Sequence, residues 1–411
     1  MSKKKKILPE FRFPEFSNNE TWADRKLSDV LFEHKEKSTG DEEVYSVSVH
    51  KGVVNQIEHL GRVFAASNTN NYKRVLPGDI IYTKSPTGDF PLGIIKQSKV
   101  SKPVIVSPLY GVFKPETTDL GVILDAYFEY PERTINYLSS IVQKGAKNTI
   151  NIHNDTFLSK SLVLPLDKKE QGKIASCFSS LDELIAAHSE KMDLLKDHKK
   201  GLMQNLFPQE GEQLPKLRFK ECEKYGMWVK KPLEIVATFV NEKTEVENLS
   251  LDTYISTENL LADYGGVSKS LKLPTSGSFT KYRKGDVLIS NIRPYLKKVW
   301  FADKYGACSN DVIVIRTNSF VTASFLFCLL GNDAFINYVM KDAEGVKMPR
   351  GDKDSIKEYP TSFPKEKSEQ QKIASCLSAL DEIIKAQSEM IEQLKLHKKG
   401  LMQSLFPKAI D

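Results

Sequence analysis

Hydrophobic side chains recur at alternating steps of three and four residues along two stretches of the chain, residues 170–208 and 369–407. In the first stretch the series comprises Phe178, Leu181, Ile185, His188, Met192, Leu195, Lys199, Leu202 and Leu206, of which His188 and Lys199 are polar. In the second stretch the matching series comprises Leu377, Leu380, Ile384, Gln387, Ile391, Leu394, Lys398, Leu401 and Leu405. Because this spacing collects apolar side chains in one narrow stripe on a helix, it predicts two coiled-coil helices with these residues in their seams.

The two stretches are copies of each other. Aligned without a gap at a spacing of 199 residues, 27 of their 39 positions are identical. Asp167 with Glu170, and Ser368 with Gln371, fit the pattern of a capping box at a helix start. Prolines at 208 and 407 mark the two ends. Each helix should be roughly 55 Å long at about 1.5 Å per residue.

A long amphipathic helix needs a partner, and the most economical partner is the other copy. Two equal helices in one chain predict an intramolecular pseudo-twofold axis, which would make the helices antiparallel. The alternative is that each helix packs separately on its own neighbouring domain. The narrow stripe, retained in both copies, favours pairing of the two helices.

A block of roughly 150 residues precedes each helix, and the two blocks begin alike, with LPEFRF at 8–13 and LPKLRF at 214–219. GDIIYTK at 78–84 matches GDVLISN at 285–291, and both read as a tight turn followed by a strand. Further strands are expected at 44–49, 104–108, 299–302 and 311–317, and helical patterns follow at about 120–143 and 322–341. The prediction is an α+β chain: two globular domains at 1–160 and 209–363, and two long antiparallel coiled-coil helices at 165–208 and 364–411.

Composition narrows the class of protein. The 411 residues have a net charge of +6 and a pI near 8.7, a modest excess that weakly favours nucleic acid as a partner. The chain lacks a run of 18 apolar residues, and the N-terminal MSKKKKILPEF lacks the apolar part of a signal peptide. None of the five cysteines forms a C-x-x-C pair. We therefore expect a cytoplasmic protein with no membrane partner, no disulfide and no metal site.

Motifs for catalysis are missing from the sequence. Amino-methyltransferases carry an Asn/Asp-Pro-Pro-aromatic motif, and this chain contains neither Asn-Pro-Pro nor Asp-Pro-Pro. A phosphate-binding G-x-x-x-x-G-K-[ST] loop is also missing, and the seven histidines form no H-E-x-x-H motif. We expect any catalysis to be supplied by another protein.

The approaches to the helices carry a resemblance to a known family. They read SLVLPLDKKEQGKIAS at 161–176 and TSFPKEKSEQQKIAS at 361–375. Each is followed by Leu-Asp-Glu, at 181–183 and 380–382, and by an HKKGLMQ-x-LFP ending, at 198–208 and 397–407. In these motifs, and over nearly its whole length, the chain resembles the specificity subunit of Type I restriction-modification enzymes.

This resemblance implies two target-recognition domains that alternate with a central and a C-terminal helical repeat. It also implies a non-catalytic subunit that binds double-stranded DNA and recruits two methyltransferase subunits and two restriction (motor-nuclease) subunits. S-adenosylmethionine, ATP and Mg would then be bound by those partners, with no cofactor bound directly by this chain. The DNA target would be asymmetric, with two specific parts separated by a fixed spacer. Two alternatives are a structural coiled-coil adaptor without nucleic acid and, less favoured, a single-chain nuclease.

Candidate DNA contacts are basic, aromatic or amide side chains near the predicted turns, although each is equally consistent with a solvated surface position. In the first block they are Lys73, Arg74, Lys84, Lys144, Lys147 and Asn148. In the second block they are Asn291, Arg293, Tyr295, Lys297, Lys298, Lys347, Arg350 and Lys353.

Overall fold

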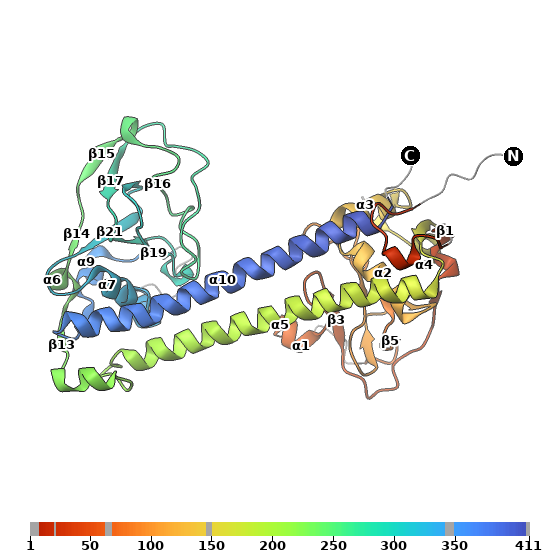
Figure 1. Ribbon diagram of the computed structural model, residues 1–411, viewed down its shortest axis with the longest axis horizontal. Helices are drawn as coiled ribbons and strands as arrows, with labels where there is room; N and C mark the ends of the chain where they lie inside the picture. The colour runs from red at the N-terminus through yellow and green to blue at the C-terminus, as the bar shows by residue number, and fades with distance from the viewer. Residues whose placement is uncertain (1–7, 20–21, 62–67, 145–149, 342–348, 408–411) are drawn as a thin grey trace. The chain divides into compact units, whose positions relative to one another are not determined.

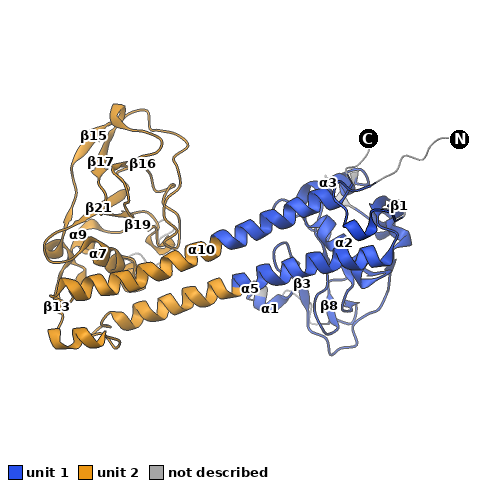
Figure 2. Ribbon diagram, in the orientation of Figure 1, with its two compact units in different colours: residues 1–189, 389–411 blue, residues 190–388 orange. Residues whose placement is uncertain are grey.

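The computed structural model describes residues 8–19, 22–61, 68–144, 150–341 and 349–407. The chain forms two compact units (Figure 2): unit 1 comprises residues 1–189 and 389–411, and unit 2 comprises residues 190–388. Each unit contains a β-rich domain and parts of two long helices, α5 (Lys168–Leu206) and α10 (Lys367–Leu405) (Figure 1). The α+β class is confirmed. The boundary between the units crosses both long helices. The bounds of the four segments predicted from the sequence therefore stay predictions.

Unit 1 is built from short strands followed by helices. Its elements are β1 (Ala23–Lys26), β2 (Leu31–Glu33), β3 (Tyr45–Ser48), β4 (Gly52–Asn55), α1 (Gln56–Leu60), β5 (Lys73–Val75), β6 (Ile80–Tyr82), β7 (Ile95–Gln97), β8 (Val104–Val106), β9 (Gly111–Pro115), α2 (Thr118–Phe128), α3 (Pro131–Ser139), β10 (Gln143–Lys144), β11 (Ile150–Asn151), α4 (Asn154–Leu158) and β12 (Ser161–Leu164).

Unit 2 follows the same plan. Its elements are β13 (Val229–Pro232), α6 (Leu233–Val236), β14 (Ala237–Phe239), β15 (Lys243–Glu245), β16 (Tyr254–Ile255), β17 (Ser278–Tyr282), β18 (Val287–Ser290), the 3-10 helix η6 (Pro294–Leu296), β19 (Val299–Phe301), β20 (Gly306–Cys308), β21 (Val312–Thr317), α7 (Ala323–Leu330), α8 (Asp333–Met340), α9 (Lys353–Glu358) and β22 (Pro360–Phe363).

The central sheets of the two units have the same topology. In unit 1 the strand order is β2-β9-β6-β7, and in unit 2 it is β14-β21-β18-β19, with every pair antiparallel. A two-stranded ribbon closes each domain, β1 with β12 and β13 with β22. The correspondence pairs β2 with β14, β6 with β18, and α4 with α9. It allows residue-by-residue comparison of the two units.

Both faces of each central sheet are covered, which explains why the central strands are apolar without alternation. In β6, Ile80 and Tyr82 join the main core of unit 1, whereas Ile81 joins a smaller cluster on the other face. In β18, Val287 and Ile289 join the main core of unit 2, whereas Leu288 faces the second cluster. The sheet is therefore the middle layer of each domain.

The two helical regions expected from the sequence are each divided into two helices. In unit 1 the break lies at Pro131, whose ring disfavours helical geometry at the preceding Tyr130, so α2 ends and α3 begins there. In unit 2 the break lies at Gly331 and Asn332. The Asn332 side chain accepts a hydrogen bond from Ala334 N at 3.0 Å and caps α8.

Inside each unit, the ends of the two long helices belong to the domain core. In unit 1, Phe178 of α5 stacks on Phe406 just beyond α10, with ring centroids 6.5 Å apart. In unit 2, Leu206 of α5 shares a core cluster with Ile373 and Leu377 of α10. The start of one helix thus packs beside the end of the other in both units, which makes the paired segments antiparallel in each.

Candidate nucleic-acid interface

The start of α5 is held by a buried carboxylate. Glu170 is 1% exposed, and its two oxygens accept hydrogen bonds from Arg12 Nε and Nη2 at 2.8 and 2.7 Å and from Trp22 Nε1 at 3.1 Å. Hydrogen bonding to Glu170 raises the pKa of the Arg12 guanidinium further above its ordinary value, although burial opposes this. A buried charge requires such partners. We call Arg12, Trp22 and Glu170 the carboxylate clamp of unit 1.

Unit 2 contains the same clamp at the start of α10. Glu369 is fully buried and accepts from Arg218 Nε and Nη2, both at 2.8 Å, and from Trp228 Nε1 at 3.1 Å. The clamp joins the entry of each domain to the helix that follows the domain. It fixes the direction in which each long helix leaves its domain.

The capping boxes predicted from the sequence are wrong in part. Asp167 does cap α5, because its side chain accepts from Lys169 N at 2.7 Å. Glu170, however, faces the clamp rather than the cap. In the second copy α10 begins at Lys367, so Ser368 lies inside the helix and Glu366 occupies the position equivalent to Asp167. In the sequence, an Arg-Phe pair and then a tryptophan recur at the start of each domain. This recurrence was the signal that could have revealed the clamp.

Ion pairs also join the two long helices within each unit. In unit 1, Lys398 of α10 donates to Asp182 of α5 and to Glu129, both at 2.5 Å. Burial would raise the pKa of Asp182, but Lys398 and Lys99 outweigh it and the pKa lies below its usual range. In unit 2 the repeat-equivalent pair is Lys199 with Asp381, also at 2.5 Å. Two lysines from the predicted seams therefore make polar contacts to the opposite helix.

The predicted seam residues are shielded from solvent. Leu181, Ile185, Met192, Leu195, Leu380, Ile384, Ile391 and Leu394 are each buried or half-buried. By contrast, Leu184 and Leu194 are 43% and 62% exposed. The pairing of individual seam residues along the whole length of the helices stays a prediction.

In unit 2, the predicted contact residues lie on a loop with unusual backbone geometry. After β18, Arg293 and Lys297 adopt left-handed conformations, with φ of 51° and 52°, on either side of η6. Asp263 and Tyr264 of a neighbouring loop also have positive φ, and these four are the only such non-glycine residues in the described ranges. This geometry is uncommon outside glycine and often accompanies functional loops.

Hydrogen bonds hold this loop against two other segments. Asp263 N and Tyr264 N donate to Leu296 O and Lys297 O at 2.9 and 3.0 Å. Arg293 N donates to Pro349 O at 2.9 Å, and Ile292 forms a bridge with Arg350. Loop 291–298 and the segment before α9 therefore form one continuous surface.

The side chains on that surface differ in their surroundings. Arg293 is exposed, Tyr295 is 47% exposed, and the Arg350 side chain is 64% exposed, although it pairs with Asp311 at 3.3 Å. Lys297 pairs with Asp333 at 2.6 Å and Lys298 donates to Thr257 O at 2.7 Å.

The remaining two candidates of unit 2 also lie near this surface. Asn291 is half-buried beneath it, and Lys353 is exposed at the start of α9. Arg293, Tyr295, Arg350 and Lys353 are thus the best placed of the unit 2 candidates to meet a polyanion.

The candidates in unit 1 are more strongly neutralised. Arg74 lies 3.3 Å from Glu36 and 2.8 Å from Glu42, and Lys73 lies 3.6 Å from Glu33. Burial lowers the pKa of the half-buried Lys84, and nearby Lys73 lowers it further. Lys144 ends β10, and the structure does not describe its side chain. Lys147, Asn148 and Lys347 lie outside the described residues.

Two other kinds of site were sought in the described ranges. No group of three or more His, Cys, Asp or Glu side chains there is arranged to hold a metal ion. No single helix there is long and apolar enough to cross a membrane, although α7 and α8, bent by 56°, pass together on length and composition.

Comparisons with known proteins show what this chain is similar to. Residues 236–396 match the family model described as Type I restriction modification DNA specificity domain. No curated protein matches the sequence. The chain is similar to the crystal structure of a Type-I restriction-modification system S subunit from M. genitalium, with a TM-score of 0.59, 14% identity and coverage of 98% of this chain and 100% of that one.

A second solved structure, which concerns complex assembly and conformational transition of the type I R-M system, matches with a TM-score of 0.50 and 15% identity, covering 95% of this chain and 98% of that one. At these identities the likeness establishes the fold.

Residues 236–396 thus match the DNA specificity domain of this family, and the chain as a whole has the fold of the S subunit, with two β-rich domains and two long helices.

Proposed function

We propose that each domain reads one half of an asymmetric, bipartite DNA target, and that the two long helices set the spacer and dock the methyltransferase subunits. The observation that carries this proposal is the duplication itself. The two domains share strand order and clamp, yet the residues on their equivalent loops differ: Lys84 follows β6 where Asn291 follows β18. A common scaffold with divergent loops suits two readers of different sequences.

The distribution of charge supports contact with a polyanion. In unit 2, Arg293, Arg350 and Lys353 lie on joined segments, beside the exposed ring of Tyr295. Arginine and lysine contact phosphates and guanine edges, whereas asparagine suits adenine. A helix of roughly 55 Å spans about 16 base pairs at about 3.4 Å each, which suits two half-sites about one helical turn or slightly more apart.

Partners and cofactors complete the proposal. The chain assembles with two methyltransferase subunits and two restriction subunits, and those partners bind S-adenosylmethionine, ATP and Mg. The faces of α5 and α10 away from the seam are the proposed docking surfaces, because their sequences match in the two copies whereas the loops of the domains differ.

Exchange of residues 214–360 for the equivalent block of a relative tests independent reading. We expect one half of the target to change, and the other half and the spacer to stay the same, because the exchange leaves unit 1 loops and both helices intact. The measurement is sequencing of methylated adenines in a host that expresses the chimera with its methyltransferase. The matched control is the unexchanged chain in the same host. A change in both halves would refute independent reading.

A further inference from the structure

A polar pocket in unit 2 lies beside the segment that precedes α9. It has a volume of about 130 Å³ and lies between the β14–β15 connection, the turn before β21, and α9. A single water molecule needs roughly 10–15 Å³ of such cavity volume. The pocket therefore has room for a small oxyanion and its hydration water. Among the described residues that line it, none is a carboxylate.

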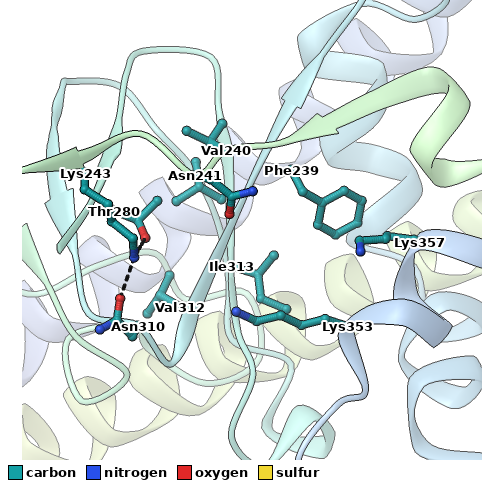
Figure 3. Close-up of a pocket in the computed structure, with 11 residues that line it drawn as sticks. Phe239, Val240, Asn241, Lys243, Thr280, Asn310, Val312, Ile313, Lys353 and Lys357 are labelled. Atoms are coloured by element: carbon teal, nitrogen blue, oxygen red, sulfur yellow. Dashed lines mark hydrogen bonds between the residues drawn. The ribbon is translucent and has the colours of Figure 1, made fainter. Parts of the chain in front are cut away.

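Three lysines converge on this pocket (Figure 3). Lys353 and Lys357 enter from α9, and Lys243 approaches from the strands on the opposite side. Lys243 Nζ donates to Thr280 Oγ1 at 3.0 Å and to Asn310 Oδ1 at 2.8 Å, so neutral groups hold it in place. An ammonium group has three donors, and these two bonds leave one for a ligand. Lys357 pairs with the largely exposed Asp354 outside the pocket lining.

Unit 1 fills the equivalent position with a carboxylate. Glu33 ends β2 as Phe239 ends β14, and each lies on the edge strand of its central sheet. Glu33 Oε1 accepts from Asn154 Nδ2, on the first residue of α4, at 2.6 Å, and it lies 3.6 Å from Lys73 Nζ. Phe239 cannot provide this charge to the first residue of α9, Lys353. Unit 1 thus neutralises this position internally, and unit 2 does not.

We propose that the Lys243–Lys353–Lys357 pocket binds a phosphate of the DNA backbone, an inference that rests on the proposed DNA reading. Lys353 of the pocket follows Arg350 by three residues, and the segment of Arg350 is bonded to the loop of Arg293. Phosphate contacts fix the position of a reader on DNA without specifying sequence. Unit 2 therefore holds the backbone at a point where unit 1 is closed by Glu33.

The test uses the full chain, alone and with its methyltransferase subunits, and a labelled duplex of random sequence at several sodium chloride concentrations. For the double variant Lys243→Gln/Lys353→Gln, the slope of log affinity against log salt should become shallower by about 0.9, the value for one lost phosphate contact. Both lysines are exposed, so the fold should persist, and circular dichroism checks this. Lys281→Gln is the matched control, since that exposed lysine lies on β17 and pairs with Glu242.

Two further variants test the comparison with unit 1. Phe239→Glu should close the pocket and reproduce the shallower slope. Glu33→Gln should release Lys73, and the slope of this variant should be steeper than that of the wild-type chain. The same slope for the double variant and the wild type would overturn the pocket assignment, as would inorganic phosphate binding to the pocket with an unchanged DNA slope. If wild-type binding were insensitive to salt, the proposed DNA function itself would fail.

Discussion

The two units keep one buried aspartate at the same turn but give it different partners. In unit 1, Asp79 accepts from Leu76 N at 2.7 Å and lies 2.8 Å from His34 Nε2. In unit 2, Asp286 accepts from Arg283 N at 2.9 Å and from Arg316 Nε and Nη2, both at 2.8 Å. The preceding Gly78 and Gly285 have φ of 88° and 89°, which L-residues rarely adopt. The turn is thus the same in both units, whereas the side chain that pairs with its aspartate differs.

A second difference follows the same rule. Glu33 closes a polar position in unit 1, whereas Phe239 leaves three lysines around a pocket in unit 2. The clamp on each long helix, in contrast, is identical in residue types and nearly identical in distances. The comparison teaches that the clamp at the start of each long helix is the same in both units, whereas contacts on the domain surface are free to diverge. Three predictions test this division.

Removal of the clamp charge should have the largest effect. Glu170→Gln and Glu369→Gln should each lower the unfolding free energy by about 3–5 kcal/mol, because a buried arginine loses its counter-charge. Hydrogen exchange of residues 168–178 and 367–377 measures the local free energy in each unit separately. Glu183→Gln and Glu382→Gln change exposed, repeat-equivalent residues on the same helices and serve as controls. Losses that differ greatly between the two units would contradict an equivalent clamp.

The lysines that join the helices should have unequal effects. The Lys398 side chain is 6% exposed and contacts two carboxylates, whereas the Lys199 side chain is 20% exposed and contacts one that is 43% exposed. We expect Lys398→Met to cost about 1.5–3 kcal/mol, as for a hydrogen bond to a charged group. Lys199→Met should cost at most about 1 kcal/mol. Urea unfolding of the two variants measures the difference, and a larger loss for Lys199→Met would reverse the ranking.

The smallest effect should be a pH dependence confined to unit 1. The hydrogen bond to Asp79 raises the pKa of His34 above 6.5, against the effect of burial, with further contributions from Glu36 and, in the opposite direction, Lys114. Because the folded pKa exceeds the unfolded one, this stabilisation is complete below about pH 6.5 and is lost as pH rises through the folded pKa. In unit 2 the partner of Asp286 is Arg316, whose guanidinium does not titrate in that range.

Hydrogen exchange of β6 and β18 at several pH values measures this effect. Protection of β6 should fall with rising pH after correction for the intrinsic exchange rate, and protection of β18 should not. His34→Gln removes the titrating group and should abolish the difference. An unchanged pH profile in that variant would show that another group is responsible.

Part of the candidate interface was accessible from the sequence. Arg293, Tyr295 and Arg350 were selected because they flank predicted turns, and the structure brings the loop of Arg293 together with the segment of Arg350. The same reasoning selected Lys73 and Arg74, which carboxylates largely neutralise. Composition near a turn indicates charge, but it does not indicate which charges a neighbouring strand cancels. Glu33, Glu36 and Glu42 come from a distant part of the chain.

The sequence by itself determined the two long helices, their duplication and the α+β order of each domain, because helical periodicity and strand patterns are local and here occur twice. Tertiary structure alone decided which residues from distant parts of the chain meet. Arg12 meets Glu170 across 158 residues, and Asp182 meets Lys398 across 216. Such pairs depend on the order of strands and the register of packed helices. The same register places Glu33 against the start of α4 and leaves Lys353 at the start of α9 without a matching carboxylate in its pocket.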